Sequence, residues 1–186
     1  GSRASEVEYI APRFARAARL MQRQRPELRF VLPVAAGLRE RVAGVMERES
    51  GGADIRLVDG RSHEVLAACD VTLIASGTAT LEAMLFKRPM VIAYAMHPLS
   101  WQLMKRMKYQ PWVGLPNILL REHAVPELLQ HDAPPRRLAG AVLDWLAEPE
   151  TMRAAQAKFV RLHHSLRQDT AQAATHAIEK VLAKTA

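Results

Sequence analysis

The sequence has few of the residues that mark secreted or membrane-spanning proteins. Cys69 is the one cysteine in 186 residues, so no internal disulfide can form. The longest apolar stretches, Val71–Ile74 and Met90–Tyr94, are strand-sized and far below the roughly 20 residues that span a bilayer. Residues 1–9 contain no apolar signal-peptide core. These absences exclude a disulfide scaffold and favour a reducing cytoplasm.

Spacings that indicate metal or nucleophile chemistry are also absent. His163 and His164 are adjacent and therefore point apart on a helix, and the remaining histidines lack metal-ligand spacing with any cysteine pair. No serine lies in a nucleophile-elbow motif, and there is no Walker-type phosphate loop. We therefore expect no metal and no cofactor, and we exclude hydrolase and ATPase functions.

The composition is that of a folded domain, with 49% hydrophobic and 24% charged residues. A formal net charge of +7 attracts nucleic acid, anionic lipid or phosphorylated substrates without choosing among them. A solvated, arginine-rich surface explains most of this charge equally well. The length suits one domain with an appended helical tail.

Hydrophobic periodicity predicts short buried strands that alternate with helices. The expected strands are Leu28–Val34, Ile55–Val58, Val71–Ala75 and Pro89–Tyr94, and the helices between them are Val7–Gln24, Leu38–Arg48, His63–Cys69 and Thr78–Lys87. Strands that are apolar on both faces and separated by helices predict an α/β fold with a doubly wound parallel sheet.

After Asn117 the pattern predicts helices only. They cover roughly Val125–Gln130, Pro135–Ala147, Glu150–Arg167 and Thr170–Leu182. We therefore expect a Rossmann-like domain over residues 1–147 and C-terminal helices over residues 148–186.

The turn Ser76-Gly77-Thr78 follows a predicted strand and opens a predicted helix. Ligands of such sheets bind at the carboxyl ends of strands, and the backbone N–H groups of a helix start attract anions. Gly77 would let a diphosphate approach closely. Helix capping by Ser76 or Thr78, with no ligand, is the alternative explanation.

Glu82 lies four residues after Thr78 and therefore on the same helical face, one turn further on. A carboxylate there can accept hydrogen bonds from two vicinal ribose hydroxyls. A solvated charge, or a partner for Lys87 or Arg88, is the alternative role.

The segment 76–85 resembles the donor-nucleotide signature of inverting sugar transferases of the GT-B type. The sequence is most similar to the lipid-A-disaccharide synthase family. The segments that carry this resemblance are Gly1-Ser2-Arg3 with Glu6-Val7, Pro89-Met90-Val91 with Tyr94, His97-Pro98, Lys105-Arg106, Leu115-Pro116-Asn117-Ile118-Leu119 and residues 125–130. The resemblance runs from Gly1 to about Leu146.

This resemblance implies a set of donor-binding residues. Gly1, Ser2, Arg3, Ser76, Gly77 and Thr78 would surround the diphosphate, Glu82 would hold the ribose, Asn117 would lie beside the donor and Val58 would flank the uracil. Arg3 would also stabilise the UDP leaving group, since a guanidinium neutralises the charge that grows there. The sequence departs from the family at Ala95 and at Arg121-Glu122, so arginine contacts made there by relatives are in doubt.

The resemblance further implies the reaction and its partners. The family transfers 2,3-diacylglucosamine from its UDP donor, UDP-2,3-diacylglucosamine, to 2,3-diacylglucosamine 1-phosphate, forming a β-1,6 linkage in lipid A biosynthesis. The catalytic base belongs to the family's N-terminal acceptor domain, which these residues do not include, so none is named and the 186 residues alone are expected to be inactive.

Alternatives are another UDP-sugar enzyme of this architecture, such as a peptidoglycan-type transferase or an epimerase, and a basic binding module without activity. We find no nucleic-acid motif and expect no nucleic-acid partner.

Residues Ser100–Val113 combine aromatic and basic side chains, including Trp101, Lys105 and Trp112. A basic helix with such an apolar face suits an anionic membrane surface, whereas packing of that face on the sheet is the alternative. The family's acylated substrates place the protein peripherally on the cytoplasmic face of the bacterial inner membrane.

The Gly1-Ser2-Arg3 loop of the family directly follows a central strand, and no such strand is present before Gly1 in these residues. We therefore predict either an exposed sheet edge or a strand supplied by another copy, because unpaired backbone groups are costly to bury. The last helix, Thr170–Leu182, would pack on the N-terminal domain or exchange between copies, giving a swapped homo-oligomer.

Overall fold

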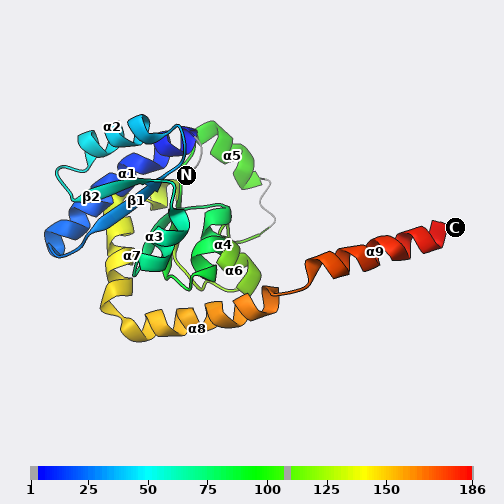
Figure 1. The fold of residues 1–186 in the computed structure, drawn as a ribbon. Coiled ribbons are helices and arrows are strands. Elements are labelled where there is room, and N and C mark those ends of the chain that lie inside the picture. The colour runs from blue at the N-terminus through cyan, green and yellow to red at the C-terminus, as the bar shows by residue number, and fades with distance from the viewer. Residues whose placement is uncertain (1–3, 107–109, 186) are drawn as a thin grey trace.

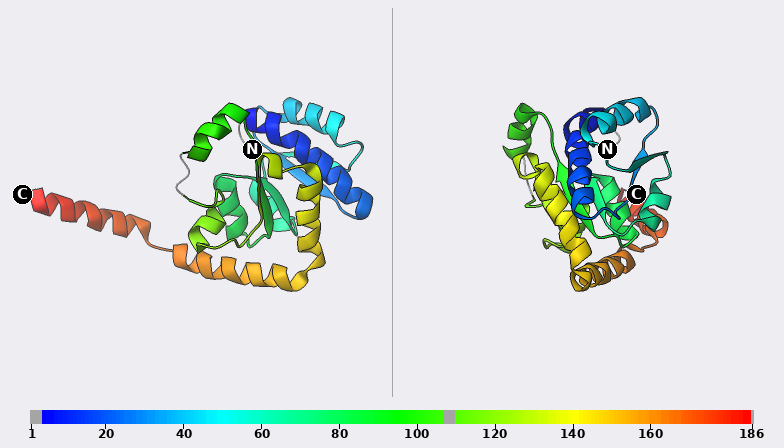
Figure 2. Two further views of the ribbon diagram at one scale, coloured as in Figure 1. Left: turned by 180° about the vertical axis from the view of Figure 1, so that it is seen from behind. Right: turned by 90° about the vertical axis from the view of Figure 1, so that its left-hand side faces the viewer.

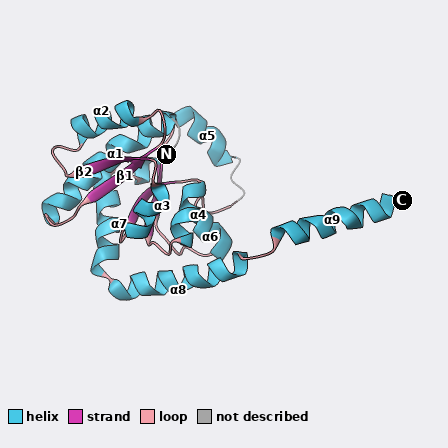
Figure 3. Cartoon of the chain, viewed as in Figure 1, coloured by secondary structure: helices cyan, strands magenta, loops and turns pink. Residues whose placement is uncertain are grey.

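The computed structural model describes residues 4–106 and 110–185. Strands and helices alternate through the first half of the chain, and helices dominate the second half (Figure 3). The strands are β1 (Phe30–Val34), β2 (Ile55–Asp59), β3 (Thr72–Ala75), β4 (Met90–Tyr94) and β5 (Glu127–Leu129). The helices are α1 (Ala4–Gln24), α2 (Arg39–Glu49), α3 (Ser62–Ala68), α4 (Thr78–Leu85), α5 (Pro98–Arg106), α6 (Leu115–Leu120), the 3-10 turn η1 (Gln130–Asp132), α7 (Pro135–Ala147), α8 (Pro149–Leu166) and α9 (Thr170–Thr185).

All strand pairs in the described residues are parallel, in two separate sheets. In one sheet β1 pairs with β2, from Phe30 opposite Ile55 onward. In the other, β4 lies between β3 and β5, with Ala93 opposite both Ala75 and Leu128. Helices pack around these strands (Figure 1). The predicted parallel α/β fold is confirmed.

A break separates the two sheets, because no strand of one is hydrogen-bonded to a strand of the other in the described residues. Within the described part of the chain β1 pairs only with β2, and β3 pairs only with β4. Each of these two strands therefore presents one edge without ladder partners. The predicted edge beside the Gly1 loop stays a prediction, because Gly1, Ser2 and Arg3 lie outside the described residues.

Helix α1 joins the two halves by its packing. Its residues Ile10 and Met21 belong to the core beneath β3, β4 and β5, whereas Val7 and Ala15 belong to a smaller core with β1 and α2. The apolar stripe predicted for this helix is thus buried on two sides. Helix α1 also contacts α7, so it fixes the relative position of the two sheets (Figure 2).

Two predicted helices are wrong in part. Residues 125–129 are not helical: Glu127–Leu129 form β5, because the free edge of β4 offers hydrogen bonds to the short segment that follows Pro126. The prediction of helices only after Asn117 fails at this strand. The helix expected over 100–113 ends earlier, since α5 stops at Arg106 and residues 110–114 are not helical.

The C-terminal helices differ in how they are held. Helix α8 packs on α4, α6 and α7 and buries Phe159 completely. Helix α9 projects away from the rest of the molecule (Figure 1). Its apolar residues Ile178, Val181 and Leu182 are 60%, 63% and 62% exposed.

Candidate functional site

The turn between β3 and α4 has the backbone shape predicted for an anion-binding turn. Gly77 has φ 139° and ψ −166°, a conformation that residues with a Cβ rarely adopt. Apart from Gly77 and its two chain neighbours, no atom of the described residues lies within 4 Å of the place where a Cβ would stand. The glycine therefore meets a conformational need and not a need for space among these residues.

The start of α4 has no side-chain cap. Ser76, one of the two predicted caps, instead donates its hydroxyl to the carbonyl of Val113 at 3.1 Å. The turn thus presents the positive end of a helix without an internal side-chain acceptor, which suits an approaching anion. The capping alternative for Ser76 and Thr78 is not observed.

Thr80 holds the turn in place through its hydroxyl group. It is fully buried, and its hydroxyl donates to the carbonyl of Gly77 at 2.7 Å. The same oxygen accepts the backbone N–H of Leu115 at 3.3 Å. Two hydroxyl groups, those of Ser76 and Thr80, therefore connect the turn to the segment 113–115 that precedes α6.

Asn117 lies inside the protein. It is fully buried, its amide nitrogen donates to the Val125 carbonyl at 2.9 Å and to Glu127 Oε1 at 2.8 Å, and its amide oxygen accepts the Val125 N–H at 3.0 Å. Every polar atom of the side chain thus has a partner within the fold. The side chain thus holds α6 against β5, and its expected place beside the donor stays a prediction.

Glu82 is accessible, with its side chain 41% exposed. Its Oε2 lies 3.5 Å from Nε2 of His63 on α3. Neither predicted alternative partner is the one observed: Lys87 Nζ donates to the carbonyl of Leu85, and Arg88 donates to that of Ala67. The carboxylate is therefore available to a ligand, with an imidazole beside it that sequence reasoning missed. Residues 19 positions apart carry no periodic signal that relates them.

Val58 lies near the carboxyl end of β2 and is partly buried. The following Asp59 forms an exposed ion pair with Arg39 at 2.7 Å. Gly60 makes the turn that follows, with φ 61°, and donates its N–H to the carbonyl of Val34 at 2.9 Å. Val58 and the turn at Gly77 thus belong to different sheets, on either side of the break.

The remaining predicted positions are only partly described. Gly1, Ser2 and Arg3 lie outside the described residues. Ala95 is buried at the end of β4. Arg121 has φ 55° at the end of α6, a left-handed conformation that favours glycine.

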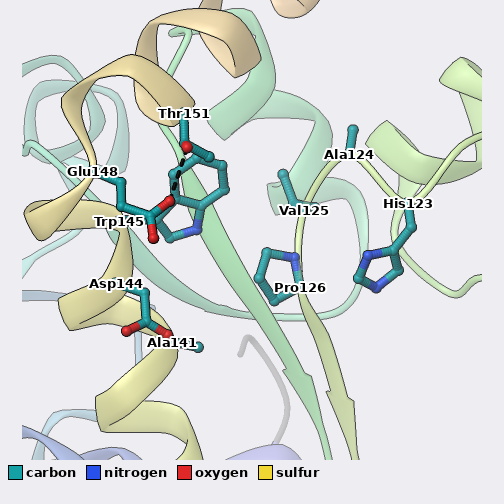
Figure 4. A pocket seen from close by; sticks show the side chains of 9 residues that line it. All are labelled: His123, Ala124, Val125, Pro126, Ala141, Asp144, Trp145, Glu148 and Thr151. Carbon is teal, nitrogen blue, oxygen red and sulfur yellow. Dashed lines mark hydrogen bonds between the residues drawn. The ribbon is translucent and has the colours of Figure 1, made fainter.

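One cavity of the described structure lies elsewhere (Figure 4). It measures about 240 Å³ and is lined by His123, Ala124, Val125, Pro126, Ala141, Asp144, Trp145, Glu148 and Thr151. Trp145 donates its indole N–H to the carbonyl of Met90, the first residue of β4. The cavity therefore lies toward the amino ends of the strands, away from the turn at Gly77.

The described part of the chain offers little support for a metal site, a reactive cysteine or a membrane-spanning helix. No group of three or more His, Cys, Asp or Glu residues there could hold a metal ion. Burial raises the pKa of the Cys69 thiol, so that side chain is a poor nucleophile. Among the described helices none is long and apolar enough to cross a membrane.

A solved structure shares the fold. A point mutant of S. aureus TarM, crystallised with fondaparinux, alpha-GlcNAc-glycerol and UDP, aligns with a TM-score of 0.54 and 13% identity. The match covers 86% of this chain and 30% of that chain. At this identity the likeness establishes the architecture alone.

Sequence relatives are much more similar. The lipid-A-disaccharide synthase of Verminephrobacter eiseniae is 54% identical and that of Albidiferax ferrireducens 51%, each over 98% of this chain and 48% of the relative. The enzyme of Neisseria meningitidis serogroup A is 47% identical over 96% of this chain. The chain thus spans about half the length of the curated relatives it matches. The family model described as lipid-A-disaccharide synthetase matches residues 1–181, so the chain belongs to the lipid-A-disaccharide synthetase family.

Proposed function

We propose that this chain is the donor-binding part of a lipid-A-disaccharide synthase. The whole enzyme would transfer 2,3-diacylglucosamine from UDP to 2,3-diacylglucosamine 1-phosphate, form a β-1,6 linkage and release UDP. The observation that carries the proposal is the uncapped turn at Gly77 with the accessible carboxylate of Glu82 one helical turn beyond it. Family membership supplies the substrate class.

Each part of the donor would have a counterpart among the residues of this chain. The N–H groups at the start of α4 would bind the diphosphate, with Ser76, Gly77 and Thr78 around it. Glu82 would accept hydrogen bonds from the ribose hydroxyls, and Val58 would flank the uracil. Gly1, Ser2 and Arg3 would complete the phosphate site, with Arg3 neutralising the charge of departing UDP.

The proposed chemistry is inversion at the anomeric carbon. The acceptor hydroxyl forms the new bond as the bond to the UDP oxygen breaks, and a base removes the hydroxyl proton. That base would come from an acceptor-binding domain outside these residues. The role left for this chain is to bind the donor and stabilise the leaving diphosphate.

Two surfaces suit further partners. Residues 148–186 would pack on the acceptor domain, which is supported by the exposure of Ile178 and its apolar neighbours on α9. Helix α5 would contact the cytoplasmic face of the inner membrane, supported by Leu99, which is 75% exposed. Neither surface needs a nucleic acid, a metal or a cofactor.

Calorimetry with UDP and a transfer assay with both lipid substrates test the proposal. We expect the 186-residue chain to bind UDP weakly and to produce no disaccharide. Robust transfer by the pure chain would contradict the division of labour, and absence of UDP binding would contradict the donor-site assignment. Comparison of acylated with unacylated UDP-sugars separates this function from that of a peptidoglycan-type transferase or an epimerase.

A further inference from the structure

The carboxylate of Glu127, the first residue of β5, collects three hydrogen bonds from one segment. Oε2 accepts the N–H of Val113 at 2.9 Å. Oε1 accepts the N–H of Gly114 at 2.9 Å and the side-chain amide of Asn117 at 2.8 Å. Both oxygens are thus used to hold the backbone that leads into α6.

The segment held in this way is the one that touches the Gly77 turn. The carbonyl of Val113 accepts the hydroxyl of Ser76, and the N–H of Leu115 donates to Thr80, whose hydroxyl in turn holds the carbonyl of Gly77. A continuous series of hydrogen bonds therefore runs from β5 to the turn. No step in it is longer than 3.3 Å.

The backbone at Gly114 is closely packed against neighbouring atoms. A Cβ on Gly114 would stand 2.2 Å from Cδ1 of Ile92 and 3.0 Å from Oε1 of Glu127. Gly114 thus lies between Ile92 of β4 and the Glu127 carboxylate, with no room for a larger side chain. Its position is determined by Glu127 on one side and by the sheet on the other.

We propose that Glu127 is a positioning residue for donor binding, which acts on the Gly77 turn through residues 113–115. This inference rests on the proposed function, because it assumes that the turn binds the UDP diphosphate. Glu127 itself does not touch the donor. Its carboxylate keeps the binding-competent shape of the turn populated, and a turn that populates this shape less often binds in proportion more weakly.

The substitution Glu127→Gln tests the proposal at almost constant volume. One oxygen becomes an NH₂ group, which faces a backbone N–H and loses at least one of the three hydrogen bonds. We expect UDP affinity to fall about tenfold, the effect of one lost hydrogen bond to a charged group. Glu122→Gln is the matched control, since Glu122 makes an exposed ion pair with Lys158. This variant should bind UDP as tightly as the parent.

A double-mutant cycle with Thr80→Val separates positioning from general loss of stability. Thr80→Val breaks the same series at its other end and should also weaken UDP binding. If both residues act through residues 113–115, the double variant binds about as weakly as the worse single variant. Affinities are measured by calorimetry on variants that melting curves show to be folded.

The outcomes distinguish the two claims. A parent chain that does not bind UDP overturns the proposed function and this inference with it. A parent that binds UDP while folded Glu127→Gln binds equally well overturns the inference alone, and so does a double variant whose effects multiply. Should Glu127→Gln fail to fold, unchanged affinity in Thr80→Val overturns the inference, and weakened affinity supports it.

Discussion

The two sheets of this molecule differ in how deeply they are buried. In the three-stranded sheet, Met90, Val91, Ile92 and Ala93 of β4 are all fully buried, because β4 has a strand on each side. In the two-stranded sheet, Val31 of β1 is 47% exposed. The comparison shows that β4 supplies the centre of the main core, whereas β1 contributes Val34 to the smaller one.

The proposed donor site would extend across this difference. The turn at Gly77 and the carboxylate of Glu82 belong to the better-buried half, whereas Val58 lies in the two-stranded half. A nucleotide that touched both halves would connect parts of the fold that otherwise meet mainly through α1.

Truncation of one apolar residue in each sheet should give the largest difference in stability. Ile92→Ala leaves a cavity in the main core and should lower the free energy of unfolding by about 2 to 5 kcal/mol. Val31→Ala, at a half-exposed site, should cost less than about 1 kcal/mol. Urea unfolding measures both, and equal losses would show that the two halves contribute alike to stability.

Amide hydrogen exchange should reveal the same asymmetry without a substitution. The amides of β4 should open with the highest free energies, and those of β1 should open more easily by at least about 2 kcal/mol, because one of its edges lacks a partner. Exchange measured by NMR or mass spectrometry gives both values. Uniform protection would indicate that the free edges are covered in solution, for example by exchange of strands between copies.

Much of the fold could be predicted from periodicity. The four strands β1 to β4 and the helices between them lie within a few residues of the predicted bounds, because each has a strong local pattern. Strand β5 could not be predicted, since Glu127–Leu129 is three residues long and becomes a strand only by pairing with β4. An edge beside the Gly1 loop was predicted from family resemblance, because no local pattern reports an absent neighbour.

In the candidate site, too, some features have a local sequence signal, whereas others depend on contacts between distant segments. The turn at Gly77 has a local signal, a glycine between a strand and a helix, and its positive φ agrees with that signal. The roles of Asn117 and Glu127 depend on contacts between segments far apart along the chain, so their types and spacing do not reveal them. Asn117 was expected beside the donor, and its complete burial with hydrogen bonds to Val125 and Glu127 could be seen only in the structure.

Substitution of one acidic residue in each half tests which half holds the nucleotide. Glu82→Ala should weaken UDP binding by about 1 to 3 kcal/mol, the usual range for hydrogen bonds to a charged group, with the fold intact. Asp59→Ala removes an exposed ion pair and should change binding by less than about 0.5 kcal/mol. Calorimetry compares the two, and a Glu82→Ala variant that binds like the parent would make Glu82 a surface charge.

The smallest expected effect concerns α8, which packs on α4, α6 and α7. Nδ1 of His163 on α8 lies 2.5 Å from Nζ of Lys87, which follows α4. Burial lowers the pKa of His163 below its ordinary value, and the charges of Lys87, His164 and Arg167 lower it further. An imidazole that accepts from a lysine must be neutral, so its protonation puts two cations side by side.

The sign of the pH effect follows from this lowered pKa. Between the folded pKa of His163 and the ordinary value of about 6.5, the unfolded chain binds more protons than the folded one, so stability rises with pH across that interval. We expect the melting temperature to fall slightly as the pH is lowered from 7.5 toward 5, and to fall less in His163→Gln, which cannot be protonated. His176→Gln on α9 is the matched control, because its partner Glu179 lies on the same exposed helix. If the melting temperature of His163→Gln depends on pH as strongly as that of the parent, carboxylates or other histidines are responsible. The contact between His163 and Lys87 then does not contribute to the pH dependence.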